Sequence, residues 1–422
     1  MDKQRLGAIA NQFGTPSFVF DESALAARMR KVKEFVGERV HLCYSIKANP
    51  FLIPAMQNLV ELLEVCSPGE LEICESLHVD PKTVLFSGVN KTLADIEHAM
   101  DAGVIRFTAE SPLHIRLLEQ AAAARDTVYP VLLRLTAGSQ FGMDESDLLN
   151  AIENRASYPH LRFVGIHYFS GTQRAKLDKD QRKELTMLGE FMDKLERNYN
   201  FVCEKIEYGP GLYFPYFAHE DHSDTLAPIR ELAPDLKQLA QRCELTIEMG
   251  RFFASECGTY LTTVIDTKVN CSSHYAIVDG GMHHVNYLGG MMGMRVPMIT
   301  HIEGPDHADS TEADWSLCGS LCTTADVLVR KIALCGLAQQ DVLAFHNIGA
   351  YSVTEGPALF LSRNMPRIIL ADDNGARLVR DTIHSSAINQ ANRHAAGPAS
   401  DVVWRRFSST DEAETEQNRN QA

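Results

Sequence analysis

Short runs rich in β-branched and aromatic residues alternate regularly with longer segments of helical periodicity from about residue 41 to residue 251. The strand-like runs are 41–48, 62–67, 83–88, 105–111, 128–136, 163–169, 205–211 and 245–251. Helical segments between them include 93–103, 112–124, 183–199 and 226–243, and each could connect two parallel strands. Eight such units in about 220 residues predict an α/β fold, a closed (β/α)8 TIM barrel, because an open doubly wound sheet would have fewer strands and a nucleotide-type glycine-rich first turn.

The pattern changes after about residue 256, where short strands alternate with turns. The strand-like runs there are 260–269, 275–281, 326–334, 341–351 and 367–380. They predict a C-terminal, mostly antiparallel β domain, a barrel or sandwich, and PSFVF at 16–20 is expected to join its strands. We therefore assign 25–255 to the barrel, and 1–24 with 256–407 to the β domain. Residues 408–422 are polar without apolar periodicity, so we expect a disordered tail.

Charge and composition limit the partners of this chain. The formal net charge of −15 has the wrong sign for binding nucleic acid or anionic lipid, so small molecules or proteins are the expected partners. The sequence shows no signal-peptide pattern and no apolar run of about eighteen residues, so we expect a cytoplasmic protein without membrane association. The 10 cysteines form no CxxC pair, which favours free thiols over a disulfide framework or a zinc ribbon.

The C-terminal ends of barrel strands carry the catalytic residues of this architecture. Lys47, in YSIKANP, ends the first strand and is flanked by apolar residues. A desolvated amine has a lowered pKa and can form a Schiff base with an aldehyde, which is how pyridoxal phosphate is attached to proteins. The other interpretation is a surface lysine that begins a loop. The remaining strand ends offer Glu64 to Glu70, Ser87-Gly88, Glu110, Arg134, His167 with Ser170, Gly209 to Gly211, and Glu248 to Arg251.

Six motifs occur in a characteristic order between about residues 16 and 365: YSIKANP, HYFSG, GPG, EMGR, GSLC and GAY. In these motifs the chain resembles the fold-type III pyridoxal-phosphate decarboxylases, the ornithine/diaminopimelate decarboxylase superfamily. The resemblance implies a barrel that binds pyridoxal 5'-phosphate, a β domain, and a homodimer with shared active sites. It also implies release of carbon dioxide from an amino acid to give an amine.

The EMGR motif would hold the cofactor ring. By the resemblance, Glu248 pairs with the pyridine nitrogen, where a carboxylate keeps the nitrogen protonated and the ring an electron sink. Gly250 and Arg251 would also contact the cofactor. Relatives that racemise alanine carry an arginine in place of this acid, so Glu248 favours decarboxylation over racemisation. The alternative for Glu248 is a surface ion pair with Arg251.

The resemblance assigns the phosphate and the ring face to two further motifs. His167 would lie against the face of the ring, and Ser170 would bind the phosphate. Backbone N–H groups around Gly209 and Gly211 would approach the phosphate, although Pro210, which replaces a third glycine, has no N–H to give. A structural role is the alternative for His167.

Further cofactor contacts are implied nearby. Glu64 would hold Lys47 after substrate releases it, and Glu70 would lie at the rim; the alternative for both is a charge at a helix N-terminus. Arg134 would contact the cofactor side of the pocket, and it needs an anionic partner because a buried unpaired arginine is costly. Tyr351, in IGAYS, would contact the cofactor.

The GSLC motif carries the implied proton donor. Cys322 would reach across the dimer interface and reprotonate the carbon that loses carbon dioxide, since a thiol with a pKa near about 8.5 can give and regain a proton. Asp326 lies on the same loop and would bind substrate. Cys318 is expected to be a core thiol. Thr323 stands where relatives that act on diamino acids carry an acid, which disfavours a free diamino acid as substrate.

Three features resemble decarboxylases of secondary metabolism: Thr323, QFGMDE at 140–145 and DGGMHH at 279–284. Such enzymes act on a glutamyl group linked to a carrier protein, in butirosin biosynthesis, or on citryl-amino-acid conjugates, in siderophore biosynthesis. The short stretch 134–140 would leave an open mouth. His283, with His284 and Arg295, could read an anionic distal group of such a conjugate; the alternatives are a mobile loop and a metal site. We expect no metal, because no carboxylate or thiol is placed to complete one.

The sequence therefore predicts decarboxylation of an L-amino acid or of a citryl- or carrier-linked conjugate, with a carrier protein as a further partner. Two other activities stay open: decarboxylation of free diaminopimelate, lysine or ornithine, and racemisation or epimerisation. A noncatalytic pyridoxal-phosphate carrier protein would have the barrel alone, so the β domain with Cys322 and Tyr351 argues against it.

Overall fold

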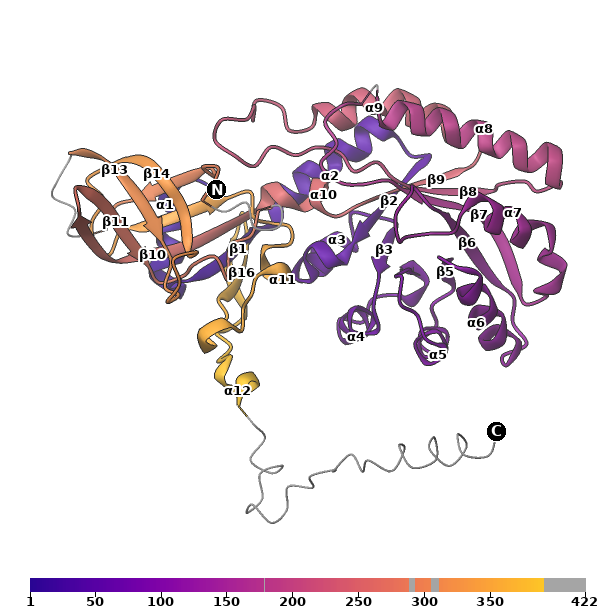
Figure 1. Cartoon of the computed structure of the whole chain (residues 1–422), viewed down its shortest axis with the longest axis horizontal. Helices are drawn as coiled ribbons and strands as arrows, with labels where there is room; N and C mark the ends of the chain where they lie inside the picture. Colours follow the sequence, from indigo (N-terminus) through magenta and orange to yellow (C-terminus); the bar gives the residue numbers. More distant parts are fainter. Residues whose placement is uncertain (178, 288–292, 305–310, 391–422) are drawn as a thin grey trace, which may run out of the picture.

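The structure is a computed structural model that describes residues 1–390 except 178, 288–292 and 305–310. It has two parts side by side, a barrel wrapped by helices and a β domain (Figure 1). The chain starts in the β domain, builds the barrel, and then returns to the β domain. One cluster of buried apolar side chains runs through both parts, so they share a core.

Eight parallel strands close the barrel, as predicted. The first, β2, pairs with the last, β9, which leaves no free edge. The strands are β2 (Val40–Ser45), β3 (Leu62–Val65), β4 (Val84–Phe86), β5 (Arg106–Ala109), β6 (Tyr129–Leu135), β7 (Leu161–Phe169), β8 (Lys205–Gly209) and β9 (Glu244–Met249). Each lies within two residues of its predicted start, and the fold class is confirmed.

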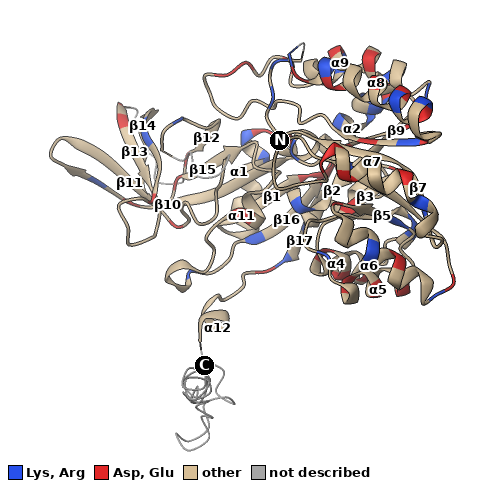
Figure 2. Cartoon of the chain, turned by 45° about the vertical axis from the view of Figure 1, so that its right-hand side comes forward, with Lys and Arg blue, Asp and Glu red and all other residues tan. Residues whose placement is uncertain are grey.

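The helices outside the barrel bury one apolar face and expose the other. Ser67 and Ser111 follow a barrel strand closely and cap the next helix, with proline at its first position, which fixes where each strand end meets its helix. Acidic and basic residues are mixed along the outer helices (Figure 2). The helices are α2 (Glu22–Val36), α3 (Ile53–Met56), α4 (Pro68–Ser76), α5 (Leu93–Asp101), α6 (Pro112–Ala123), α7 (Glu145–Glu153), α8 (Gln181–Tyr199) and α9 (Ala227–Leu239).

The β domain is a nine-stranded sheet in which most neighbours are antiparallel. The order is β14-β13-β11-β10-β1-β16-β17, and β15 pairs with both β10 and β12. Its strands are β1 (Ser17–Asp21), β10 (Gly258–Asn270), β11 (Ser273–Val278), β12 (Ile299–Ile302), β13 (Glu312–Cys318), β14 (Val327–Cys335), β15 (Val342–His346), β16 (Arg367–Asp372) and β17 (Gly375–Arg380). The early strand β1 lies between β10 and β16, so PSFVF joins this sheet as expected.

Several elements differ from the sequence-based expectations. The single run predicted at 367–380 is a hairpin, because the chain turns at Asp373 and Asn374. Strands β12 and β13 had no predicted counterpart; β12 is only half-buried and β13 begins with acidic residues, so neither has a clear apolar pattern. Helix α1 (Lys3–Phe13) was also missed, and it packs Leu6 and Ile9 against the sheet.

Short elements complete the chain: α10 (Arg251–Ala254), α11 (Ser352–Glu355), α12 (Ser386–Asn389), and 3-10 turns at Ile46–Ala48, Pro50–Leu52, Pro81–Thr83, Arg155–Ser157, Ser255–Cys257 and Phe360–Ser362. We keep the domain division after residues 24 and 255 as a proposal, which the strand positions support. The predicted tail, 408–422, lies outside the described residues. Among the helices that are described, none has the length and apolarity to span a membrane.

Candidate active site

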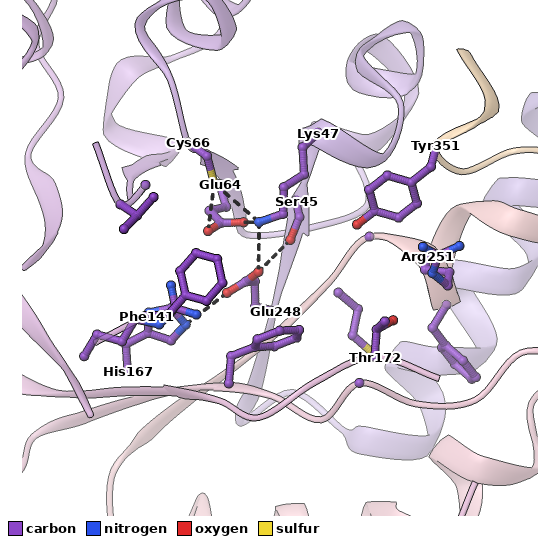
Figure 3. A pocket seen from close by; sticks show the side chains of 18 of the residues that line it. Ser45, Lys47, Glu64, Cys66, Phe141, His167, Thr172, Glu248, Arg251 and Tyr351 are labelled. Carbon is purple, nitrogen blue, oxygen red and sulfur yellow. Dashed lines mark hydrogen bonds and ion pairs between the residues drawn. The ribbon is translucent and has the colours of Figure 1, made fainter. Parts of the chain in front are cut away.

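A cavity of about 660 Å³ opens at the C-terminal ends of the barrel strands. Charged side chains from separate strands converge on it, and the β domain contributes residues from one side (Figure 3). Its lining is Ser45, Lys47, Glu64, Cys66, Gly88, Val89, Asn90, Glu110, Arg134, Phe141, His167, Phe169, Thr172, Gly211, Leu212, Glu248, Met249, Gly250, Arg251, Phe252, Tyr351 and Glu355.

Lys47 lies in the 3-10 turn that follows β2 and points into the cavity. Its Nζ is 2.7 Å from Glu64 Oε2, 3.7 Å from Glu248 Oε1 and 3.3 Å from Cys66 Sγ (Figure 3). Burial acts to lower the pKa of Lys47, but the carboxylates of Glu64 and Glu248 outweigh it and raise that pKa well above its ordinary value. The lowered pKa expected from the apolar flanks is therefore wrong, and the lysine is an ammonium ion here.

Glu248, at the end of β9, is buried. Its Oε1 accepts a hydrogen bond from Ser45 Oγ at 2.8 Å, and its Oε2 lies 3.2 Å from His167 Nε2. Burial opposes ionisation of Glu248, but Lys47 and His167 together hold its pKa well below the ordinary value. Glu248 is thus an ionised carboxylate that faces the cavity, and the alternative of a surface pair with Arg251 is not seen.

The two acids near Lys47 differ in position. Glu64 is buried and lines the cavity, where Oε2 accepts from Lys47 and Oε1 from Cys66 Sγ at 3.2 Å. Glu70 lies in the first turn of α4, which Ser67 caps, and its Oε2 accepts from the Cys66 backbone N–H at 2.6 Å. Burial raises the pKa of Glu70. Glu70 therefore stabilises the strand-to-helix turn and does not line the cavity.

Arg134 has the anionic partner that its burial requires. Its Nη1 donates to Glu110 Oε1 at 2.9 Å, and both side chains are buried. Its guanidinium also lies over the ring of Phe141, 4.9 Å from the centroid. The partner is Glu110 at the end of β5, and the three side chains together form one wall of the cavity.

The HYFSG motif is arranged differently from the prediction. His167 and Phe169, two residues apart on β7, both line the cavity, as strand alternation requires. Ser170 does not line it: its Oγ donates to Glu184 Oε1 at 2.5 Å and accepts from Arg174. Thr172 lines the cavity instead. The alternation could have identified Phe169; Thr172 lies beyond the strand, where alternation gives no guide.

Glycines and an arginine form the end of the cavity opposite Glu64. Gly211 has φ +57°, and a Cβ there would lie 1.8 Å from Gly171 O, so no other residue fits. Gly209 packs against Phe169 and does not line the cavity. Gly250 precedes α10, and Arg251 begins it. The Arg251 guanidinium lies 4.3 Å from the ring centroid of Tyr351, and its Nε has no hydrogen-bond partner among residues that the structure describes.

The β domain is tied directly to the lysine turn. Tyr351 N–H donates to Ala48 O at 2.6 Å, and Asn49 Nδ2 donates to Gly349 O at 2.9 Å. Thr354 Oγ1 also donates to Lys47 O at 3.4 Å. The segment around Tyr351 therefore closes one side of the cavity and fixes the backbone that carries Lys47.

The Cys322 loop does not line the cavity of its own chain. Cys322 and Thr323 are exposed, and neither lines the cavity. Asp326 is buried and accepts from the N–H groups of Met282 and Leu321 at 2.7 and 2.8 Å. Asp326 therefore holds this loop together in place of the predicted contact with substrate. Cys318 is half-buried on β13.

The residues expected to read a distal group also lie away from the cavity. His283 is buried and contacts His284 with ring centroids 3.7 Å apart and ring planes tilted by 43°, and burial lowers the pKa of His283 to about 4. His284 bonds Tyr260 Oη at 2.9 Å. Arg295 is half-exposed, 3.4 Å from Glu220. The two histidines are core residues in this structure, which corrects the prediction, and part of their loop lies outside the described residues.

Comparisons with known proteins agree with this geometry. The family model described as "Pyridoxal-dependent decarboxylase, pyridoxal binding domain" matches residues 22–255. The L-glutamyl-[BtrI acyl-carrier protein] decarboxylase of Niallia circulans is 28% identical over 90% of this chain and 94% of its own. The diaminopimelate decarboxylase of Zymomonas mobilis is 26% identical over 89% and 92%.

Solved structures share the whole fold. The diaminopimelate decarboxylase of M. jannaschii in complex with L-lysine has a TM-score of 0.79 at 22% identity, covering 92% of this chain and 94% of that one. The Helicobacter pylori enzyme complexed with L-lysine has a TM-score of 0.78 at 20% identity, covering 91% and 98%. The barrel and the β domain are therefore arranged as in these structures.

Proposed function

Because the chain belongs to the pyridoxal-dependent decarboxylase family, we propose that it decarboxylates an amino-acid group carried on a larger conjugate. The enzyme class and the cofactor follow from the family: the protein is a carboxy-lyase that uses pyridoxal phosphate. The observation that carries this function is the contact of Lys47 with both Glu64 and Glu248 inside one cavity.

The residues of the cavity fit this cofactor. Lys47 offers an amine, and the buried ionised Glu248 suits a protonated ring nitrogen. The opposite end, with Gly211, Gly250 and Arg251, suits a phosphate, since it combines a backbone that approaches closely with a guanidinium whose Nε is unpartnered among the described residues. Thr172 offers a hydroxyl at the same cavity.

When bound, pyridoxal phosphate supplies an aldehyde that reacts with amines and a ring that withdraws electrons from the bond to be broken. Lys47 must lose its extra proton before its nitrogen can react, and Glu64 Oε2, at 2.7 Å, is placed to receive it. Glu64 could then return that proton to the lysine nitrogen. Glu248, as a buried ionised carboxylate, would pair with the ring nitrogen of the bound cofactor and favour its protonated form.

We propose that a second copy of the chain supplies Cys322 as the proton donor for the carbon that loses carbon dioxide. The thiol is exposed on a loop that Asp326 holds rigidly, and it does not line the cavity of its own chain. A homodimer with shared sites would bring the two together. Arg295, which is exposed beside Glu220, remains a proposed substrate contact in such a dimer.

Two observations favour a conjugate over a free diamino acid. The residue after Cys322 is the uncharged Thr323, which cannot pair with a distal ammonium group. A relative with similarity over nearly the whole chain acts on a glutamyl group linked to a carrier protein. A carrier-linked glutamyl group or a citryl-amino-acid conjugate is therefore the proposed substrate class, and a carrier protein is the proposed partner in secondary or siderophore metabolism.

Diaminopimelate is the second candidate substrate, because several relatives are diaminopimelate decarboxylases. Carbon dioxide release should be measured with free diaminopimelate, lysine, ornithine and glutamate, and with glutamyl-carrier and citryl conjugates. We expect kcat/KM for one conjugate to exceed that of every free amino acid by at least about tenfold, a difference of about 1.4 kcal/mol. Faster turnover of free diaminopimelate would replace the conjugate by this second candidate.

A further inference from the structure

A second acid lies in the barrel near Glu248 and has no role in the mechanism above. Glu207, on β8, is only 1% exposed, and neither of its carboxyl oxygens has a hydrogen-bond partner among residues that the structure describes. It lies beside His167 on β7 and Thr246 on β9 in the strand register. Glu248 is two residues beyond Thr246, so both acids belong to the inner face of adjacent strands.

The stabilising contacts of this pair lie at Glu248. Ser45 Oγ donates to its carboxylate at 2.8 Å, and Lys47 Nζ and His167 Nε2 lie 3.7 and 3.2 Å from it, whereas Glu207 accepts no hydrogen bond from the described residues. Two carboxylates in one buried site cannot both ionise without a large cost. The proton therefore belongs to the acid that lacks donors, which is Glu207.

The charges around Glu207 agree with this assignment. Burial acts first, and the negative charges of Glu248 and Glu64 then raise the pKa of Glu207 well above its ordinary value, against the opposing effect of Lys47 and Arg134. The titratable and charged groups that face it from the surrounding strands are Cys43 on β2, Lys47 after β2, Glu64 on β3, Arg134 on β6, His167 on β7 and Glu248 on β9.

A second cavity, of about 110 Å³, is lined in part by Glu207 and Thr246 and lies toward the N-terminal ends of the barrel strands, on the other side from the substrate pocket. Most of its lining is apolar, and its charged residues other than Glu207 lie close to the N-terminal ends of strands: Arg106, Arg162, Lys205 and Glu244. Because most of this lining is apolar, the cavity gives the Glu207 carboxyl group little hydration, which further disfavours its ionised form.

We propose that Glu207 is the proton-bearing member of a buried carboxyl pair with Glu248. Glu207 is thereby a positioning residue: it leaves the negative charge of the pair on Glu248, which faces the pocket. This role rests on the proposed function, because it matters only if Glu248 holds the cofactor. The protonation states of Glu207 and Glu248 can nevertheless be measured without any substrate.

Infrared spectroscopy of the full-length holoenzyme tests the assignment. At pH 7.5 the wild type should show the carbonyl stretch of a protonated carboxyl group, and Glu207→Gln should lose that band, while Glu207→Asp should retain an acid band. Glu248→Gln removes the neighbouring negative charge, so the wild-type Glu207 band should then disappear at a lower pH. The proposal would be overturned if the band persisted in Glu207→Gln, or if Glu248→Gln left unchanged the pH midpoint at which the band disappears. The Glu248→Gln measurement can be made even if Glu207→Gln does not fold.

The pH dependence of stability gives an independent reading. An acid whose pKa is raised by folding binds a proton that the unfolded chain releases, so the free energy of unfolding falls as pH rises above about 4.3, the ordinary value for glutamate. Glu207→Gln should flatten this fall between pH 5 and 8. Equal slopes in the two proteins would contradict the proposal. Neither measurement uses decarboxylation. A negative result for Glu207 therefore leaves the proposed function standing, and a failure to find decarboxylation leaves the protonation of Glu207 standing.

Discussion

The barrel pocket and the Cys322 loop both contain buried acids, but they use them in opposite ways. In the pocket, Glu64 and Glu248 form ion pairs with the ammonium of Lys47 at the wall of the cavity. In the loop, Asp326 is satisfied by two backbone N–H groups. A carboxylate held by backbone amides fixes a conformation, whereas one held by a lysine beside a cavity can exchange that partner for a ligand. The group that binds a buried acid therefore indicates the function of that acid better than its burial does.

The largest effect that this comparison predicts comes from Lys47. Lys47→Ala should abolish covalent retention of the cofactor after borohydride reduction, and should lower kcat/KM by roughly 10³-fold or more, which is about 4 kcal/mol of barrier. Mass spectrometry of the reduced protein checks the attachment. Cofactor still bound covalently in Lys47→Ala would show that the pocket acids serve some other group.

The next largest effect is expected at the Arg134–Glu110 ion pair. This pair lines the pocket, but it is buried as Asp326 is. Arg134→Met leaves the Glu110 carboxylate buried without its partner and should cost about 3–5 kcal/mol of unfolding free energy. Adding Glu110→Leu should recover most of this loss. Urea unfolding of the three proteins measures it, and a loss below 1 kcal/mol in the single variant would show that water replaces the arginine.

Asp326 should affect stability less. Asp326→Ala removes the acceptor of two backbone N–H groups and should cost about 1–3 kcal/mol. Asp326→Asn, the matched control, keeps one carbonyl oxygen and should cost less. Thermal unfolding distinguishes the two variants. If Asp326→Ala is as stable as wild type but its KM rises, Asp326 contacts substrate and belongs with the pocket acids.

The smallest expected effect is a difference in cofactor affinity between variants of two neighbouring residues, Thr172 and Ser170. Thr172→Ala should raise the Kd for pyridoxal phosphate by about tenfold, the value of one hydrogen bond to a charged group. Ser170→Ala removes a hydroxyl that bonds Glu184 and should change that Kd by less than about twofold. Fluorescence titration of the apoenzymes compares them. The opposite order would restore Ser170 as the phosphate ligand.

The barrel and most pocket residues could be predicted because both depend on local pattern. Strand periodicity located eight strand ends, and a closed barrel brings those ends together whatever the loops do. Lys47, Glu64 and Glu248 all lie at such ends or within two residues of them.

The errors arose where local pattern gives no guide. Thr172 lies beyond the end of β7, where the chain leaves the strand and the alternation of faces stops. The raised pKa of Lys47 depends on two acids from other strands, which the apolar flanks of its own strand do not reveal. The buried position of His284 depends on hydrogen bonds with Tyr260 and Asn364, which lie 24 and 80 residues away in the sequence.

The hydrogen bonds from Tyr351 and Thr354 to the lysine turn have a consequence for biosynthesis of the protein. The backbone that carries Lys47 is made early, but its last anchors are encoded about 300 residues later. A nascent chain that has completed only the barrel lacks one side of the cavity. The site is therefore finished only when almost the whole chain has left the ribosome, and a fragment cut after residue 255 should bind the cofactor poorly even if its barrel closes.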